Sequence, residues 1–284
     1  MPVHPSISIV ITTYNRSDAL LPVLQALSAQ DDKDFEIVVA DDGSSQFHQD
    51  ALANAASRYG LKLTHVWHPD VGFTASRIRN RGVAAALGRY IVLLDGDCVP
   101  EVDFVRRHRQ LQDQDCFVNG SRVLLSRQLT EKVIAGSVAM VNRSWAHWLG
   151  LWWRKDASKL TGLIRLPNWC RPKSGRFRWK GIRSCNMGVW RENYLAIDGF
   201  DESFVGWGHE DADFVLRLQN FGVARKNGFC ATEVYHLWHP ESSRAQESLN
   251  AEKVCERMGS GSYLPTTGYS KSLGGSEVVI RRLG

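Results

Sequence analysis

Several features that mark common protein classes are missing from this sequence of 284 residues. The six cysteines are scattered and include no Cys-x-x-Cys pair, which argues against a zinc or dithiol site and favours free thiols in a reducing compartment. No uninterrupted apolar run reaches the roughly 18 residues that span a bilayer, and no basic leader with a cleavage site precedes the first strand-like run. We therefore expect a cytoplasmic protein, for which any membrane contact, on the inner face, is peripheral.

Two nucleotide-binding signatures are also missing. The sequence contains neither a Gly-x-x-x-x-Gly-Lys phosphate loop nor a Gly-x-Gly-x-x-Gly fingerprint, which disfavours nucleotide hydrolases and dehydrogenases. Disorder is not expected, because 43% hydrophobic and 23% charged residues are ordinary values for a globular protein. The length suits one large domain or two fused halves.

Strand-like and helical patterns alternate through the N-terminal part of the chain. The predicted strands cover residues 7–12, 35–40, 61–67 and 90–94, and the predicted helices cover residues 17–29, 47–59 and 74–87. This alternation predicts βαβ units and an α/β fold whose mixed, mainly parallel sheet is flanked by helices. Further along, the pattern becomes irregular, with helices expected at 101–112 and 130–140 and a strand at 116–120.

An acidic pair follows the buried strand 90–94. Asp95 and Asp97 should emerge at the carboxyl end of this strand, where open α/β sheets place their ligands. Gly96 allows the backbone to bend between them, so both carboxylates can converge on one hard cation and the phosphates that it carries.

Small polar and charged residues follow the first two strands. Thr12, Tyr14 and Arg16 come after the first strand, and Asp42 comes after the second. Such side chains can hydrogen-bond a base and a ribose, because an Asp carboxylate accepts from ring N–H and hydroxyl groups. The alternative is ordinary turn chemistry, since Asp-Gly-Ser is a common turn.

A second acidic signature, Gly206-Trp207-Gly208-His209-Glu210-Asp211, opens a predicted helix that runs to Asn220. Its carboxylates could do proton chemistry. The alternative is that Glu210, Asp211 and Asp213 only serve the helix start, where acidic residues interact favourably with the helix dipole.

Two histidines follow in the stretch from residue 234 to 240. If this stretch is extended, His236 and His239 point to opposite faces, so only one of them would bind a metal. Mixed carboxylate, phosphate and imidazole ligation suits Mn²⁺, with Mg²⁺ as the competitor.

Residues 141–183 form a basic, tryptophan-rich insertion. Its cations are Arg143, Arg154, Lys155, Lys159, Arg165, Arg171, Lys173, Arg176, Arg178, Lys180 and Arg183, against the single acid Asp156. Trp145, Trp148, Leu149 and Trp152 fall at the spacing of one helix face. The insertion could lie on an anionic membrane surface or bind an anionic glycolipid. Alternatively, its Trp residues could pack as a lid over the acceptor cleft, with a solvated basic rim. Nucleic-acid binding is not expected, because no such motif is present.

Four segments, in their order and spacing, resemble the family 2 glycosyltransferases of the GT-A fold. They are residues 9–16 (IVITTYNR), 41–44 (DDGS), 75–82 (ASRIRNRG) and 90–97 (YIVLLDGD). Residues 186–188 (NMG), 199–202 (GFDE) and 206–211 (GWGHED) are similar to the acceptor half of bacterial chondroitin-polymerase-type and β-1,4-galactosyltransferase-like enzymes. The resemblance covers about residues 6–240.

The resemblance implies a role for each motif on the donor side. Thr12 and Asp42 would contact the uridine, and Arg77 would lie near the diphosphate. Asp95 and Asp97 would hold the metal together with the ribose and phosphates of the donor.

The resemblance also assigns the remaining site residues. The related enzymes have a metal-binding His in a Tyr-His pair, which favours His236 over His239. Glu210 would contact the acceptor beside Trp207, and Asp211 would be the general base. His209 stands where the relatives usually have Gly, which could narrow the acceptor pocket.

The implied function is a metal-dependent inverting transfer of a hexose or N-acetylhexosamine from a UDP-sugar to a surface glycan or glycolipid, such as lipopolysaccharide, capsule or another polysaccharide. Residues 6–97 would form the nucleotide-sugar-binding half, residues 98–240 the acceptor half and residues 241–284 a C-terminal tail. A sugar nucleotidyltransferase would normally carry a Gly-rich basic loop that residues 12–16 lack, and a non-catalytic glycan-binding module would have lost Asp97 or Asp211. The sugar, the acceptor, the linkage and the oligomeric state stay open.

Overall fold

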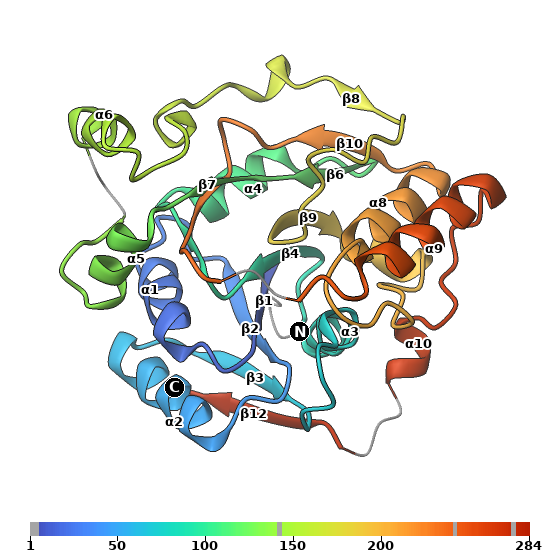
Figure 1. Ribbon diagram of the computed structural model, residues 1–284, viewed down its shortest axis with the longest axis horizontal. Coiled ribbons are helices and arrows are strands. Elements are labelled where there is room, and N and C mark those ends of the chain that lie inside the picture. Colours follow the sequence, from blue (N-terminus) through green and yellow to red (C-terminus); the bar gives the residue numbers. More distant parts are fainter. Residues whose placement is uncertain (1–5, 141–143, 241–242, 274–276) are drawn as a thin grey trace.

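The computed structural model describes residues 6–140, 144–240, 243–273 and 277–284 (Figure 1). Val141 and Arg143, at the start of the predicted basic insertion, lie outside the described residues.

The N-terminal half has the predicted alternation of strands and helices. It consists of β1 (Ile7–Thr13), α1 (Ser17–Ser28), β2 (Phe35–Asp41), α2 (Gln46–Tyr59), β3 (Leu63–Trp67), α3 (Ala75–Ala85) and β4 (Tyr90–Asp95). Each predicted boundary is met within two residues. Strands β3, β2, β1 and β4 lie side by side and parallel, so the residues that follow β1, β2 and β4 meet at one edge of the sheet.

The second half is less regular, as predicted. It consists of β5 (Cys98–Pro100), α4 (Phe104–Leu111), β6 (Cys116–Asn119), β7 (Ser121–Leu124), α5 (Arg127–Ile134), α6 (Trp145–Trp153), β8 (Lys173–Ser174), β9 (Asn186–Trp190), α7 (Arg191–Ala196), α8 (Glu210–Asn220), β10 (Ala224–Asn227) and β11 (Glu233–His236). Short 3₁₀ turns lie at Thr161–Leu163 and Asn168–Cys170. The helix predicted at 130–140 is present but shifted to Arg127–Ile134, because Ser126 caps it at an earlier start and Gly136, at a φ of 71°, follows its end.

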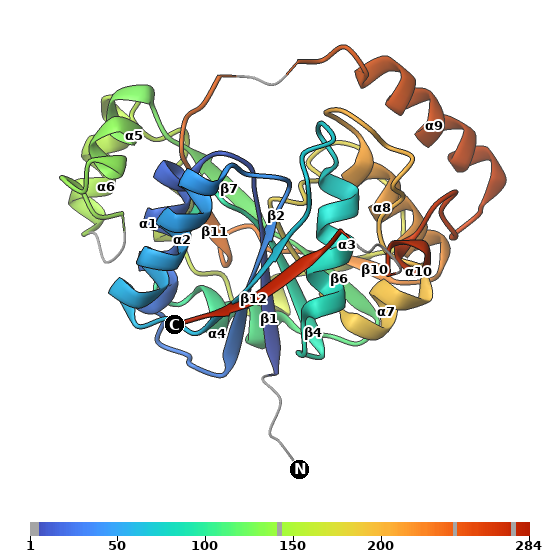
Figure 2. The same ribbon diagram turned by 90° about the horizontal axis from the view of Figure 1, so that it is seen from below.

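The two halves share one large sheet in the strand order β12-β3-β2-β1-β4-β9-β6-β10-β8. Strands β1, β2, β3, β4, β6 and β10 run one way, and β8, β9 and β12 run the other, which confirms a mixed and mainly parallel sheet. Helices α1 and α2 cover one face of the sheet, and α3, α7 and α8 cover the other (Figure 2). The side chains of β1 alternate accordingly, since Ile9 and Ile11 pack with the α1 side and Val10 packs with the α3 side.

A second, three-stranded sheet has the order β5-β11-β7. Strand β11 is antiparallel to β5 and parallel to β7, with His236 opposite Cys98. The pairing therefore brings a histidine from late in the chain next to the acidic pair that follows β4.

The segment predicted only as a tail contains α9 (Glu247–Ser260), α10 (Tyr269–Ser272) and β12 (Val279–Leu283). Helix α9 lies beside α8, and β12 returns to pair with β3 at the edge of the large sheet (Figure 1). The C-terminal segment thus contacts both halves of the protein.

The tryptophan face predicted for residues 145–152 lies on helix α6, and its side chains differ in burial. Trp148 is buried and stacks on Tyr235 with 4.5 Å between the ring centroids, whereas Trp145, Leu149 and Trp152 are exposed. Within the described ranges, none of the helices combines the length and the apolar character that crossing a bilayer requires.

Candidate active site

A cavity of about 1050 Å³ opens at the carboxyl ends of β1 and β4 and faces the first turn of α8. Nearly all of the site residues predicted from the sequence line it. They are Thr12, Tyr14, Arg16, Asp42, Asp95, Asp97, Trp207, His209, Glu210, Asp211, His236 and His239. The two acidic signatures, which are distant in the sequence, therefore face the same space.

Arg77 is the predicted site residue that the structure does not bring to the cavity. Its guanidinium pairs with Glu202 at 3.2 Å instead. Arg79, on the neighbouring face of α3, lines the cavity in its place. The sequence contained a signal for this, because Arg79 lies three residues after Ser76 and four before Val83, on the buried face of the helix.

The buried guanidinium of Arg79 connects the two acidic signatures. Its Nη2 lies 3.2 Å from Oδ1 of Asp95, and its Nη1 lies 3.0 Å from Oε1 of Glu210. Burial alone would lower the pKa of Arg79, but the two carboxylates raise it above its usual value. Arg79 is therefore a permanent cation that fixes the distance between the end of β4 and the start of α8.

A group of possible metal ligands lies next to this bridge. Ligand atoms of Asp97, Cys98 and His236 lie within 4.8 Å of one another. Oδ2 of Asp97 lies 3.6 Å from Nε2 of His236 and 3.2 Å from Nε2 of His239. The premise that the whole stretch is extended fails, because β11 ends at His236 and residues 237–240 are irregular, and both histidines lie next to Asp97.

The protonation states in this group suit a divalent cation. Burial would raise the pKa of Asp97, but the hydrogen bond from His239 and the proximity of His236 lower it below its usual value. Burial lowers the pKa of His236 to about 4, so its imidazole is neutral near pH 7 and keeps a free lone pair. Burial also raises the pKa of the Cys98 thiol well above its usual value, so the thiol stays protonated. The hydrogen bond to Asp97 raises the pKa of His239 instead. A carboxylate with the neutral His236 imidazole fits Mn²⁺ or Mg²⁺ better than a thiolate-binding metal.

Asp211, in the first turn of α8, has the properties of a proton acceptor. Burial and the neighbouring Glu210 carboxylate raise its pKa to about 7, and Arg79 opposes this only in part. A carboxylate with a pKa near neutrality can take a proton and release it again at physiological pH.

The loop before α8 has an unusual backbone. Gly206 and Gly208 have positive φ angles, and His209 adopts a φ of 70°, which is uncommon for a residue with a side chain. The indole Nε1 of Trp179 donates to Nδ1 of His209 at 3.2 Å, so the end of the tryptophan-rich insertion forms part of the cavity wall. The guanidinium of Arg244 lies 5.1 Å from the ring centroid of Trp207.

Asp42 and Tyr14, which follow β2 and β1 at the edge of the cavity, are already hydrogen-bonded within the protein. The Asp42 carboxylate accepts from Nε2 of His68 at 2.7 Å and from the hydroxyl and backbone N–H of Thr74. The hydroxyl of Tyr14 donates to Asp70 at 2.7 Å. Because a carboxylate offers about four acceptor positions, Asp42 keeps one for a ligand.

Asp213 does more than serve a helix start. Its side chain is fully buried and pairs with Arg217 on the same helix at 2.7 Å and with Arg257 of α9. These two ion pairs argue against the interpretation that Asp213 only serves the helix start, because Asp213→Asn would weaken the pairing of the buried Arg217 and of the partly buried Arg257.

Two family models match the chain. The glycosyl transferase family 2 model matches residues 8–162, which is more than half of the chain, and the model for the N-terminal domain of galactosyltransferase matches residues 167–240.

Curated relatives include two polysaccharide synthases. The chain is 28% identical over 239 residues to the chondroitin synthase of Escherichia coli, which covers 76% of the chain and 32% of that protein. It is 31% identical over 241 residues to the hyaluronan synthase of Pasteurella multocida, which covers 77% of the chain and 23% of that protein. The chain thus spans about a third or less of the length of these relatives.

Among solved structures, the chain is similar to a mannosyltransferase from Pyrobaculum calidifontis in complex with GDP-Man and Mn²⁺. The TM-score is 0.57 at 15% identity, and the match covers 90% of this chain and 65% of that one. This likeness shows a shared fold, the GT-A fold that the sequence motifs predict.

The raised pKa of Asp211 can be measured directly. In a carboxyl ¹³C NMR titration, with Asp211→Asn used for assignment, we expect Asp211 to titrate near pH 7. Glu210→Gln should lower this pKa by about one unit or more, because it removes a neighbouring negative charge and frees the Arg79 guanidinium. Glu192→Gln, on the surface of α7, should leave it unchanged. An Asp211 pKa close to 3.8, or no response to Glu210→Gln, would refute the assigned electrostatics.

Proposed function

The chain belongs to glycosyl transferase family 2, and on this premise we propose that it transfers a hexose or N-acetylhexosamine from a UDP-sugar, with inversion, to a surface-glycan or glycolipid acceptor. The observation that carries the proposal is the pairing of Arg79 with two carboxylates. One is Asp95, near the candidate metal ligands, and the other is Glu210, next to the candidate base. Family membership leaves the nucleotidyltransferase and non-catalytic alternatives without support.

The donor would occupy the side of the cavity that the ends of β1, β2 and β4 form. Thr12 and the remaining acceptor position of Asp42 would contact the uridine, with Tyr14 and Arg16 alongside. This arrangement is typical of ligand sites at the carboxyl ends of parallel strands.

The candidate metal ligands are Asp97, His236 and His239, with the second oxygen of Asp95, whose first oxygen faces Arg79. A bound Mn²⁺ or Mg²⁺ would neutralise charge on the departing diphosphate. Arg77 does not line the cavity and pairs with Glu202, so we do not propose it for the diphosphate role that the resemblance implied. Arg79 is the cation of this helix that lines the cavity.

In the proposed reaction, Asp211 takes the proton from the acceptor hydroxyl while the hydroxyl oxygen attacks the anomeric carbon. The bond from this carbon to the diphosphate oxygen breaks, and UDP leaves with the bonding electron pair. One direct displacement inverts the anomeric configuration, and it needs one base on the side opposite the leaving group. The exposed ring of Trp207 and the His209 side chain would line the acceptor position.

The acceptor class is suggested by the relatives, whose names describe the synthesis of polysaccharides. Because the chain spans a third or less of their length, their complete activities are not transferred to it. We propose an acceptor from the same chemical class, namely a growing surface polysaccharide or a lipid-linked precursor of one.

The insertion is further proposed to attach the protein to an anionic membrane surface. Trp145, Leu149, Trp152 and Trp153 form one exposed face of α6 at the spacing i, i+4, i+7 and i+8. The exposed cations Arg154 and Lys155 follow at the end of this helix. Exposed Trp residues beside cations are typical of helices that lie in a membrane interface. The lid interpretation applies to the other end of the insertion, where Trp179 lines the cavity.

The donor and metal assignments are tested by calorimetry and thermal shift. UDP with Mn²⁺ should raise the midpoint of unfolding, whereas GDP-mannose with Mn²⁺ should have little effect, because a ligand that binds only the native state stabilises it. Asp97→Ala should abolish the Mn²⁺-dependent UDP binding and leave the fold intact, and Asp50→Ala, on the surface of α2, should change neither. Unchanged UDP affinity in Asp97→Ala would remove Asp97 from the site, and a preference for GDP-mannose would overturn the UDP-sugar donor.

Membrane attachment is tested by sedimentation with lipid vesicles. The protein should pellet with anionic vesicles at low salt and be released by high salt, since each basic residue near such a surface contributes about 1 kcal/mol. The double substitution W152S/W153S should weaken the binding, and Phe47→Ser, which removes an equally exposed aromatic from α2, should not. Protein that stays in the supernatant with anionic vesicles would contradict the attachment.

A further inference from the structure

Helix α9 lies outside both family matches, which end at residues 162 and 240, yet it packs along the loop that carries the candidate acceptor residues. We call residues 201–209 the acceptor loop. It runs from the end of the α7 region to the first turn of α8 and includes Trp207 and His209.

Side chains of α9 contact this loop along its length. Nζ of Lys253 donates to the carbonyl of Ser203 at 2.5 Å, and Nδ2 of Asn250 donates to the carbonyl of Val205 at 3.3 Å. The side chain of Gln246 covers Gly206 so closely that a Cβ at this glycine would lie 2.9 Å from its Cγ. Near the other end of the loop, Nε2 of His209 lies 4.0 Å from the Glu247 carboxylate.

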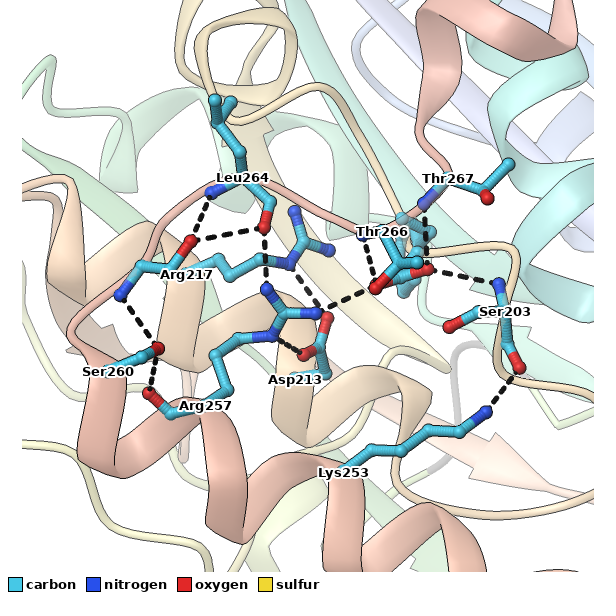
Figure 3. A network of polar contacts seen from close by, with 12 residues as sticks. Ser203, Asp213, Arg217, Lys253, Arg257, Ser260, Leu264, Thr266 and Thr267 are labelled. Carbon is cyan, nitrogen blue, oxygen red and sulfur yellow. Dashed lines mark hydrogen bonds and ion pairs between the residues drawn. The ribbon is translucent and has the colours of Figure 1, made fainter.

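Arg257 connects the start of the loop to the first turn of α8 (Figure 3). Its Nη2 lies 2.8 Å from Oδ2 of Asp201, at the start of the loop, and its Nε pairs with Oδ1 of Asp213, two residues beyond the candidate base. Its Nη1 donates to the carbonyl of Leu264 at 2.5 Å, so the segment after α9 is held at the same point.

The network around Arg257 is mostly buried and is balanced in charge. Asp201 and Asp213 are fully buried, and the second oxygen of Asp213 pairs with the buried Arg217 at 2.7 Å. Asp201 also accepts from the backbone N–H groups of Thr266 and Thr267 (Figure 3). Two buried carboxylates therefore face the buried guanidinium of Arg217 and the partly buried guanidinium of Arg257, whose side chain is 12% exposed. Such a network is stable only when every member is paired, so it fixes one geometry.

We infer that α9 is a positioning element of the active site and that Arg257 is its principal positioning residue. By holding Asp201 and Asp213 together, Arg257 fixes the acceptor loop and the first turn of α8, and hence the positions of Trp207 and Asp211 in the cavity. The inference rests on the proposed transferase function for its kinetic consequences, but not for the loop geometry.

The kinetic test compares Arg257→Ala and Arg257→Lys with the unsubstituted protein. Because a misplacement of about 1 Å can reduce turnover by roughly 10²-fold, we expect kcat/KM for the acceptor to fall by about 10- to 100-fold in Arg257→Ala. The affinity for UDP with Mn²⁺ should stay within about twofold, because the donor side of the cavity does not touch this network. Lysine can reach one carboxylate but not both, so Arg257→Lys should recover part of the loss.

A matched control is Arg109→Ala, which removes an arginine of α4 that pairs with Asp32 and Asp34 far from the cavity. Arg109→Ala should lower the free energy of unfolding but leave kcat/KM for the acceptor unchanged. If Arg257→Ala fails to fold, N250A/K253M removes two loop contacts and keeps the buried network, and it should show the same selective loss in milder form.

Hydrogen exchange of the acceptor loop is the second readout, and it does not depend on activity. Amides of residues 203–209 should exchange faster in Arg257→Ala than in the unsubstituted protein or in Arg109→Ala. Unchanged exchange and acceptor kinetics, or a loss that appears equally in UDP affinity, would overturn the positioning role. Faster exchange in a protein without UDP-sugar binding or transfer would instead support the role of α9 and overturn the proposed function.

Discussion

The arrangement of the site depends on the buried guanidinium of Arg79. It is held in α3, between β3 and β4, and it binds Asp95 at the end of β4 and Glu210 at the start of α8. Removal of the guanidinium would leave both carboxylates without the cation that they share. This one interaction therefore sets the distance between the side of the cavity that has the candidate metal ligands and the side that has the candidate base.

Several carboxylates line the cavity, and they differ in how completely neighbouring cations and hydrogen-bond donors stabilise their negative charge. Asp97 lies next to two histidines, which lower its pKa. Burial and the Glu210 carboxylate raise the pKa of Asp211 to about 7, because the positive charge of Arg79 offsets them only in part. Two carboxylates in one cavity thus differ in proton affinity because their neighbours differ. The low-pKa group is suited to hold a cation, and the high-pKa group is suited to accept a proton.

Patterns that repeat locally were predictable, and contacts between distant segments were not. The strands and helices before Asp97 follow from apolar runs and helical periodicity, and the first acidic motif was found because strand ends collect ligand-binding residues. The second motif was found from its acidic residues at a predicted helix start and from the family resemblance. Arg79 was missed because three arginines alternate in the same segment and only the helix face distinguishes them. Helix α9 buries only Asn250 and Val254, so its polar contacts with the acceptor loop leave no periodic apolar signal in the sequence.

The central claim is that Asp211 accepts the proton in a transfer across the cavity that Arg79 organises. Its most direct test is kcat of Asp211→Asn in a steady-state transfer assay, with UDP-sugar affinity measured on the same protein. Asparagine keeps the size and most of the hydrogen bonding but cannot accept the proton, so kcat should fall by roughly 10²–10⁴-fold while donor affinity barely changes. Near-normal kcat, or a loss that appears wholly as weaker UDP-sugar binding, would contradict the account.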